Sequence, residues 1–114
     1  MEFADALMSW SEFVDECAEG YSFGVYEYDN DLQVRDLLEL AFDGEADELL
    51  GAEEARRSIV VVDERFRRIL KPGVRVPGAS ETWWSGAVPA RGGVELVEDL
   101  EENYRTEIDL VEGR

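Results

Sequence analysis

Among side chains that could take part in catalysis or metal binding, carboxylates are by far the most numerous in this sequence. It holds 28 aspartates and glutamates, no histidine and a single cysteine, Cys17. Histidine is the commonest general base and transition-metal ligand, and it is the middle member of the usual catalytic triad. A lone cysteine without a histidine has no base to activate it. The glycines form no phosphate-binding motif. We therefore expect a protein that is not an enzyme, with no catalytic residue, metal or cofactor.

One acidic run, Asp29-Asn30-Asp31, has the spacing with which a calcium-binding loop begins. Such a loop needs glycine at its sixth position and glutamate at its twelfth, where this sequence has Val34 and Leu40. The run is therefore interpreted as a turn and a helix cap. The other acids are too numerous for the sequence to identify a pair that works as general acid and base.

The charge is distributed in three blocks. Residues 1–54 hold 17 acids and one base, Arg35; residues 55–91 hold eight bases and three acids; residues 92–114 hold eight acids and two bases, for a net charge of −17. Such a charge repels nucleic acids and anionic membranes and attracts cationic partners. The sequence thus predicts a basic protein as partner, with no direct contact to nucleic acid or membrane. The alternative is that the charge serves solubility in an acidic, salt-adapted proteome.

The positive charge of the middle block forms a basic strip: Arg56, Arg57, Arg65, Arg67, Arg68, Lys71 and Arg75. In so acidic a chain we expect this strip to neutralise neighbouring acidic helices. Surface ion pairs contribute only about 0–1 kcal/mol each, but they help to define which helices pack together. Phosphate binding is the alternative.

Two adjacent tryptophans, Trp83 and Trp84, lie in the turn-rich segment 72–93, which contains all three prolines. Neighbouring side chains of an extended segment point to opposite sides, so one backbone direction does not easily bury both rings. We expect one ring to pack against the helices and the other, by preference Trp84, to remain exposed as a binding anchor, since tryptophan is enriched in interface hot spots. Burial of both rings is the alternative. Acids of the first helix would steer a basic partner toward this anchor: Glu12, Asp15, Glu16 and Glu19.

The elements that position these residues are predicted to be mainly helical. Apolar side chains recur at steps of three and four in four segments, which predict helices near 2–19, 31–42, 52–70 and 94–104. Within the third of these, the run SIVVV at 58–62 is rich in β-branched residues, so a strand is the alternative there. Residues 45–50 are expected to form a short helical turn. A minor two-stranded sheet is expected between 21–28, where apolar residues alternate, and 106–111.

The same periodicity predicts the core. Cys17 lies on the apolar stripe of the first helix and is expected to be buried. The other residues expected to be largely buried are Trp10, Phe13, Leu37, Leu38, Ile59, Val62, Phe66, Ile69, Val97 and Leu100.

The sequence as a whole indicates one acidic globular domain over 1–114, a small helical bundle of about four helices. Its beginning lacks the bases of a signal peptide and no apolar run is long enough to cross a membrane, so we expect a cytoplasmic protein.

No family motif is recognised. The character is that of a protein-binding module, such as an immunity or inhibitor protein that neutralises a basic toxin or nuclease. A DNA-mimicking inhibitor and a housekeeping assembly subunit are the alternatives. The oligomeric state is not predicted.

Overall fold

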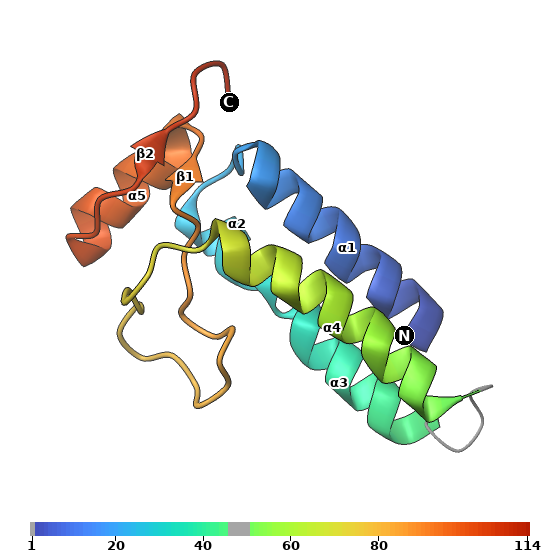
Figure 1. The fold of residues 1–114 in the computed structure, drawn as a ribbon. Helices are drawn as coiled ribbons and strands as arrows, with labels where there is room; N and C mark the ends of the chain where they lie inside the picture. The colour runs from blue at the N-terminus through green and yellow to red at the C-terminus, as the bar shows by residue number, and fades with distance from the viewer. Residues whose placement is uncertain (1, 46–50) are drawn as a thin grey trace.

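The computed structural model describes residues 2–45 and 51–114, and over these ranges the chain forms five helices and two short strands (Figure 1). The helices are α1 (Phe3–Glu19), α2 (Val25–Leu32), α3 (Val34–Glu45), α4 (Ala52–Ile69) and α5 (Val94–Tyr104), and the strands are β1 (Arg91–Gly92) and β2 (Asp109–Leu110). The fold is mainly α with a small sheet, as predicted. A short helical turn was expected at 45–50. Glu45 is the last residue of α3, and residues 46–50 lie outside the described residues.

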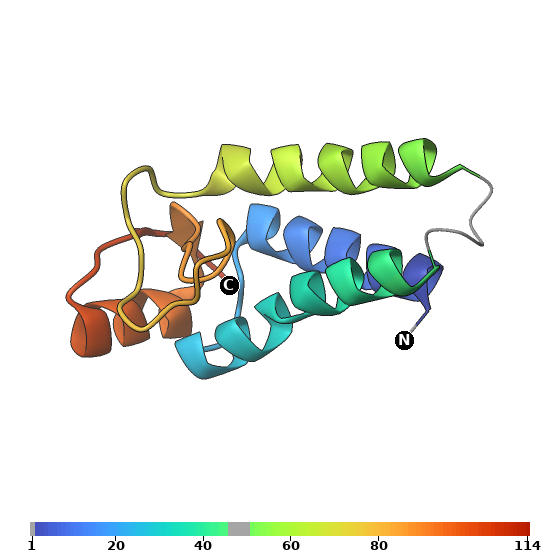
Figure 2. The ribbon, with the colours of Figure 1, turned by 90° about the horizontal axis from the view of Figure 1, so that it is seen from below.

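Three long helices form the main body, with α1 packed against both α3 and α4. Figure 2 shows them stacked in rows, with α1 and α4 running in the same direction and α3 in the opposite one. Aromatic rings fill the space between the rows: Trp10 of α1 lies edge-on to Phe66 of α4, at a centroid distance of 5.0 Å. The predicted helix at 52–70 is confirmed, including the run at 58–62, because Ile59, Val62 and Phe66 form one buried stripe.

The strand predicted at 21–28 is wrong. Residues 25–32 form α2, and the buried side chains in this region are Tyr21, Val25, Tyr28 and Leu32, at helical steps of four and three. Phe23, which the alternating pattern would bury, is 52 % exposed. The aromatic residues had suggested a strand. In the structure these residues form a helix whose buried side chains pack against neighbouring helices, α1 and α5 among them.

The helix predicted at 31–42 is in fact the end of α2 and most of α3, with the boundary at Gln33. The run Asp29-Asn30-Asp31 therefore lies inside α2 and does not cap the start of a helix. The start of α2 is instead capped from a distance, because the backbone N–H of Val25 donates to the carboxylate of Asp99 on α5 at 3.0 Å.

The sheet also differs from the prediction, because β2 pairs with β1 and not with residues 21–28. The two strands are parallel, with Arg91 opposite Asp109 and Gly92 opposite Leu110. Parallel neighbours need a crossover connection, and α5 provides it. The resulting β-α-β unit lies at the end of the three-helix body where α1 ends (Figure 1).

The segment 70–90 leaves α4, extends past α2 and returns to β1 (Figure 2). Its two ends are joined by a hydrogen bond of 2.9 Å from the backbone N–H of Lys71 to the carbonyl of Val88. Its tip is closed by a second hydrogen bond of 2.9 Å, from the backbone N–H of Val76 to the carbonyl of Gly86. The hydroxyl of Tyr28 ties it to α2 by donating to the carbonyl of Ala87 at 2.6 Å. We call residues 70–90 the strap.

The core prediction is correct for most positions, Cys17 among them, but Leu37 is 44 % exposed. The buried stripe of α3 passes through Arg35, Leu38 and Ala41, which places Leu37 on the opposite side of the helix. Ile69 and Val97 are half-buried. No helix in the described ranges is both long enough and apolar enough to cross a membrane.

Candidate functional site

The four acids of α1 that were expected to act together are divided by the structure between two sides of the helix. Glu12 and Glu16 line a hollow between α1 and the junction of α2 and α3, together with Asp31 of α2. Asp15 instead pairs with Arg65 of α4, and Glu19 lies 3.8 Å from the guanidinium of Arg114. Of the four, Glu12 and Glu16 share one hollow, and Glu19 lies close enough to raise the pKa of Glu16 through its charge.

The lining of this hollow contains three carboxylates and no base. Partial burial, and next the charge of Asp31, raise the pKa of Glu16, whereas Arg114 lowers it by a smaller amount. Asp31 also accepts a hydrogen bond of 2.6 Å from the hydroxyl of Tyr21. A cation near this hollow would relieve the repulsion between these carboxylates.

The prediction that Trp84 is the exposed anchor is wrong, because Trp84 is 6 % exposed and Trp83 is half-buried. Both rings turn toward the helices, at 5.6 Å from each other and nearly perpendicular. The N–H of Trp84 donates to Asp36 on α3 at 3.2 Å, which satisfies the polar atom of the buried ring. Trp83 packs on the other side of the strap against Phe66, with Arg67 4.1 Å from its ring centroid.

A buried charge cluster connects the three long helices. Arg35 of α3 donates through Nε and Nη2 to both carboxylate oxygens of Asp63 on α4, at 2.8 and 2.9 Å. Trp10 of α1 donates to the same carboxylate at 3.0 Å, and Glu39 lies 2.9 Å from Arg35. Arg35 also lies 4.3 Å from the ring centroid of Trp84, so the strap packs onto the cluster.

The sequence reasoning missed this cluster, although two signals were present. Arg35 is the single base among residues 1–54, and Asp63 lies on the apolar stripe between Ile59 and Phe66. One guanidinium nitrogen, Nη1 of Arg35, is buried without a hydrogen-bond partner. The nearby face of the Trp84 ring offers it a cation–π contact instead. The charges compensate one another, so the cluster is a structural tie between helices.

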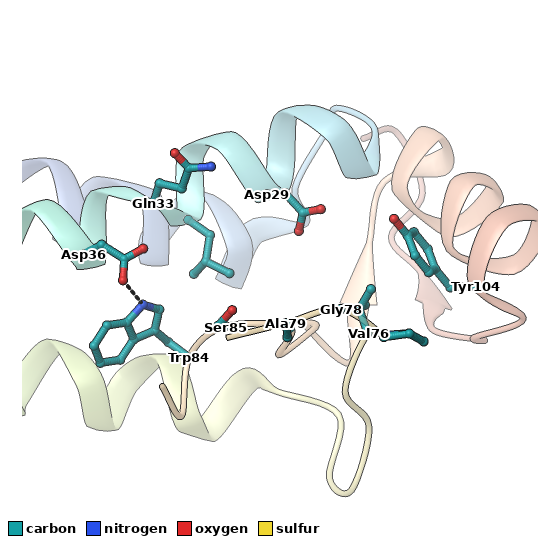
Figure 3. Close-up of a pocket in the computed structure, with 12 residues that line it drawn as sticks. Asp29, Gln33, Asp36, Val76, Gly78, Ala79, Trp84, Ser85 and Tyr104 are labelled. Atoms are coloured by element: carbon teal, nitrogen blue, oxygen red, sulfur yellow. Dashed lines mark hydrogen bonds between the residues drawn. The ribbon is translucent and has the colours of Figure 1, made fainter. Parts of the chain in front are cut away.

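An open pocket of about 320 Å³ lies between α2–α3 and the strap (Figure 3). Asp29, Gln33 and Asp36 form one wall, Trp84 lies in the other, and Tyr104 of α5 stands at the far end. We call this the strap pocket. One of its lining residues, Trp84, was predicted as a binding residue. Asp29 was interpreted from the sequence only as part of a turn and helix cap, and Asp36 was not considered.

The polar lining of the strap pocket is acidic. No lysine or arginine lines it, and neither Asp29 nor Asp36 forms an ion pair within the described ranges. Partial burial raises the pKa of Asp29. Among the described residues, no group of three potential ligands is arranged to hold a metal ion.

Comparisons with known proteins identify no relative: no family model matches the chain, and no curated protein or solved structure is significantly similar to it. The function therefore has to be argued from the geometry and charge of the molecule itself.

Proposed function

We propose that this protein is a binding module for a basic protein. The observation that carries the proposal is the burial of Arg35, which is only 2 % exposed. Arg35 is the single base among residues 1–54, and it points into the core and pairs with Asp63. The surfaces of α1, α2 and α3 therefore carry acids with no exposed base from their own half of the chain.

The basic strip compensates only part of this charge. Arg65 reaches Asp15, and Arg56 pairs with Glu39 at 2.8 Å. Arg57 and Arg67 pair within α4, Arg75 donates to carbonyls of the strap, and Lys71 donates to the carbonyl of Glu107. The hollow at Glu12 and Glu16 and the strap pocket have no base in their lining. A positively charged surface would be attracted to this side of the molecule at long range.

The finer part of the proposal is that the module inhibits its partner, as an immunity protein does with a basic toxin or nuclease. A small acidic domain that covers the basic substrate-binding surface of such a protein would exclude its substrate. The proposal gives this chain no catalytic role.

The test is capture of basic proteins at controlled salt. The protein, immobilised through an N-terminal tag, is mixed with host lysate at low salt and eluted in steps of rising salt. We expect the retained proteins to be enriched in basic ones and to elute near physiological salt, where the Debye length falls to about 8 Å. Each retained protein is then purified and its Kd measured, and loss of its enzymatic or toxic activity on complex formation identifies inhibition.

Two triple variants with equal charge change provide the control. Glu12→Gln/Glu16→Gln/Glu19→Gln removes three acids of α1, and Glu98→Gln/Glu101→Gln/Glu102→Gln removes three of α5. We expect the α1 variant to lose much more affinity for the purified partner. Retained proteins with the same distribution of isoelectric points as the lysate would contradict the proposal, and so would equal losses from both variants.

A further inference from the structure

We propose that the strap pocket binds an arginine side chain of the partner. This inference rests on the proposed function, because the arginine belongs to the basic protein, and it deepens that function by naming the group recognised. The strap pocket is separate from the hollow at Glu12 and Glu16, so the two surfaces can be tested independently.

The size of the strap pocket suits a single long side chain. Its volume of about 320 Å³ is at the lower end of small-ligand pockets, and it is open to solvent. Leu32 and Val76 contribute apolar surface to its lining, against which the methylene stem of an arginine can pack. Tyr104 adds an aromatic ring at the far end.

The charge of the pocket selects a cation. Asp29 and Asp36 come from the same wall, with Gln33 between them. Asp36 already accepts a hydrogen bond from Trp84, whereas Asp29 has no side-chain partner within the described ranges. Asp29 is therefore the carboxylate that we expect to form the ion pair, with Asp36 adding longer-range attraction.

Arginine is favoured over lysine by the aromatic lining. A guanidinium is planar and more weakly hydrated than an ammonium, so it can stack on a ring while it donates hydrogen bonds to a carboxylate. The protein repeatedly uses this arrangement with its own arginines. Arg35 lies on the Trp84 ring and pairs with Asp63, and Arg56 lies 4.3 Å from the centroid of Phe42 and pairs with Glu39. The strap pocket presents Tyr104 and Asp29 as a ring and a carboxylate without an arginine, since Trp84 is buried and already contacts Arg35.

The experiment is a titration followed by ¹⁵N–¹H NMR, which tolerates the weak affinity of a single side chain. The probes are N-acetyl-arginine amide, N-acetyl-lysine amide and the uncharged N-acetyl-citrulline amide. We expect arginine to give saturable shifts of the Trp84 indole N–H and of the backbone amides of Gly78 and Ser85. The lysine probe should bind more weakly, and the citrulline probe should cause no saturable shift at these positions.

The matched variants are Asp29→Asn and Asp43→Asn. Both remove one exposed aspartate, but Asp43 lies near the end of α3 and does not line the strap pocket. Loss of one ion pair is expected to raise the Kd for arginine about fivefold in Asp29→Asn. The Kd of Asp43→Asn should stay within about twofold of that of the original protein.

Three outcomes would overturn the inference. They are shifts centred on residues outside the strap pocket, equal changes of the arginine Kd in the two variants, and a citrulline probe that binds as tightly as the arginine probe. Capture of basic proteins separates this failure from failure of the proposed function. If Asp29→Asn retains basic proteins as well as the original protein does, the pocket is not their binding site, but the function stands. If the original protein retains none, the proposed function itself is wrong.

Discussion

Asp63 accepts hydrogen bonds from side chains on two other helices, Arg35 on α3 and Trp10 on α1. A carboxylate buried in this way is stable only while its partners compensate its charge. The reverse holds for Arg35, whose guanidinium would be left in the core if Asp63 were neutral. The cluster thus makes the relative positions of three helices depend on two charged residues.

We predict that Asp63→Asn lowers the free energy of unfolding by about 3–5 kcal/mol, because it removes the buried carboxylate that pairs with Arg35 and leaves the half-buried Glu39 as its one remaining ion-pair partner among the described residues. Urea unfolding at neutral pH measures this loss. The double variant Arg35→Met/Asp63→Leu should recover much of it, since it removes both charges and retains apolar volume. Asp43→Asn is the exposed control and should change stability by less than about 0.5 kcal/mol. A double variant less stable than Asp63→Asn would show that the cluster stabilises the fold on balance.

A second residue-scale prediction concerns the pH dependence of the strap pocket. Burial raises the pKa of Asp29 above its ordinary value of 3.8, and only the ionised carboxylate attracts a cation. The affinity for N-acetyl-arginine amide should therefore be highest at neutral pH and fall about fivefold on acidification, as it does in Asp29→Asn, with a midpoint above 3.8. NMR titrations at a series of pH values, limited to those where the spectrum remains folded, give this midpoint. The weak residual binding of Asp29→Asn should lack this transition, and a midpoint at or below 3.8 would contradict the assignment of Asp29.

The strap is the element on which the pocket depends, because it supplies the wall opposite Asp29 and Asp36 (Figure 3). It contains no regular helix within residues 70–90, and its shape is maintained by a few hydrogen bonds and by Trp84. Gly86 has a φ of 77°, in the left-handed region, and a Cβ there would lie 2.6 Å from the Cβ of Ala79. The tip of the strap therefore needs glycine at this position for two reasons.

We predict that Gly86→Ala displaces the tip of the strap and weakens arginine binding in the pocket. Gly73→Ala is the matched control, because Gly73 also has a positive φ, 72°, but a Cβ there would meet nothing within 4 Å. Left-handed strain alone costs about 1 kcal/mol, so the control should lose that much stability and retain the pocket. The amide spectra and the arginine Kd of both variants provide the measurement. Equal effects would mean that strain, and not the contact with Ala79, determines the result.

The two tryptophans lead to a second prediction about the strap. Trp84→Ala removes a buried ring with a satisfied N–H and exposes the cluster at Arg35, so it should cost about 3–5 kcal/mol. Trp83→Ala removes a half-buried ring on Phe66 and should cost clearly less. Thermal and urea unfolding of both single variants test this order. The reverse order, or two equal losses, would contradict the burial described for the two rings.

At the scale of the whole molecule, the net charge of −17 opposes folding through self-repulsion. Within the described ranges most of the acids form no ion pair, while the cluster at Arg35 and Asp63 is shielded from salt by burial. Added salt should therefore weaken the repulsion more than it weakens the attractions.

We predict that the Tm rises by several degrees between about 10 mM and about 150 mM sodium chloride, as the Debye length falls from about 30 Å to about 8 Å. Differential scanning calorimetry at a series of salt concentrations measures this. The variant Glu98→Gln/Glu101→Gln/Glu102→Gln, which carries three fewer negative charges, should show a smaller rise. A Tm that falls with salt would show that surface ion pairs such as Arg56–Glu39 outweigh the repulsion.

The sequence by itself determined the long helices and much of the core. Helical periodicity is a local property, so the steps from Ile59 through Val62 to Phe66 identified α4, and those around Leu100 identified α5. It also predicted the burial of Cys17, and the order of its charged residues alone defines the uneven charge. The local pattern was misleading at 21–28, where aromatic residues suit a strand as well as a buried helix.

Only the tertiary structure decided which distant residues meet. Arg35 and Asp63 are 28 positions apart, and the sequence shows them simply as one base among acids and one acid on an apolar stripe. Trp84 is buried because Asp36, 48 positions away, accepts its N–H, and β2 pairs with β1 because α5 brings the two strands together. The strap pocket exists only where α2–α3, the strap and Tyr104 converge. Such contacts depend on how the packed elements are placed in space, and local side-chain periodicity carries no information about that placement.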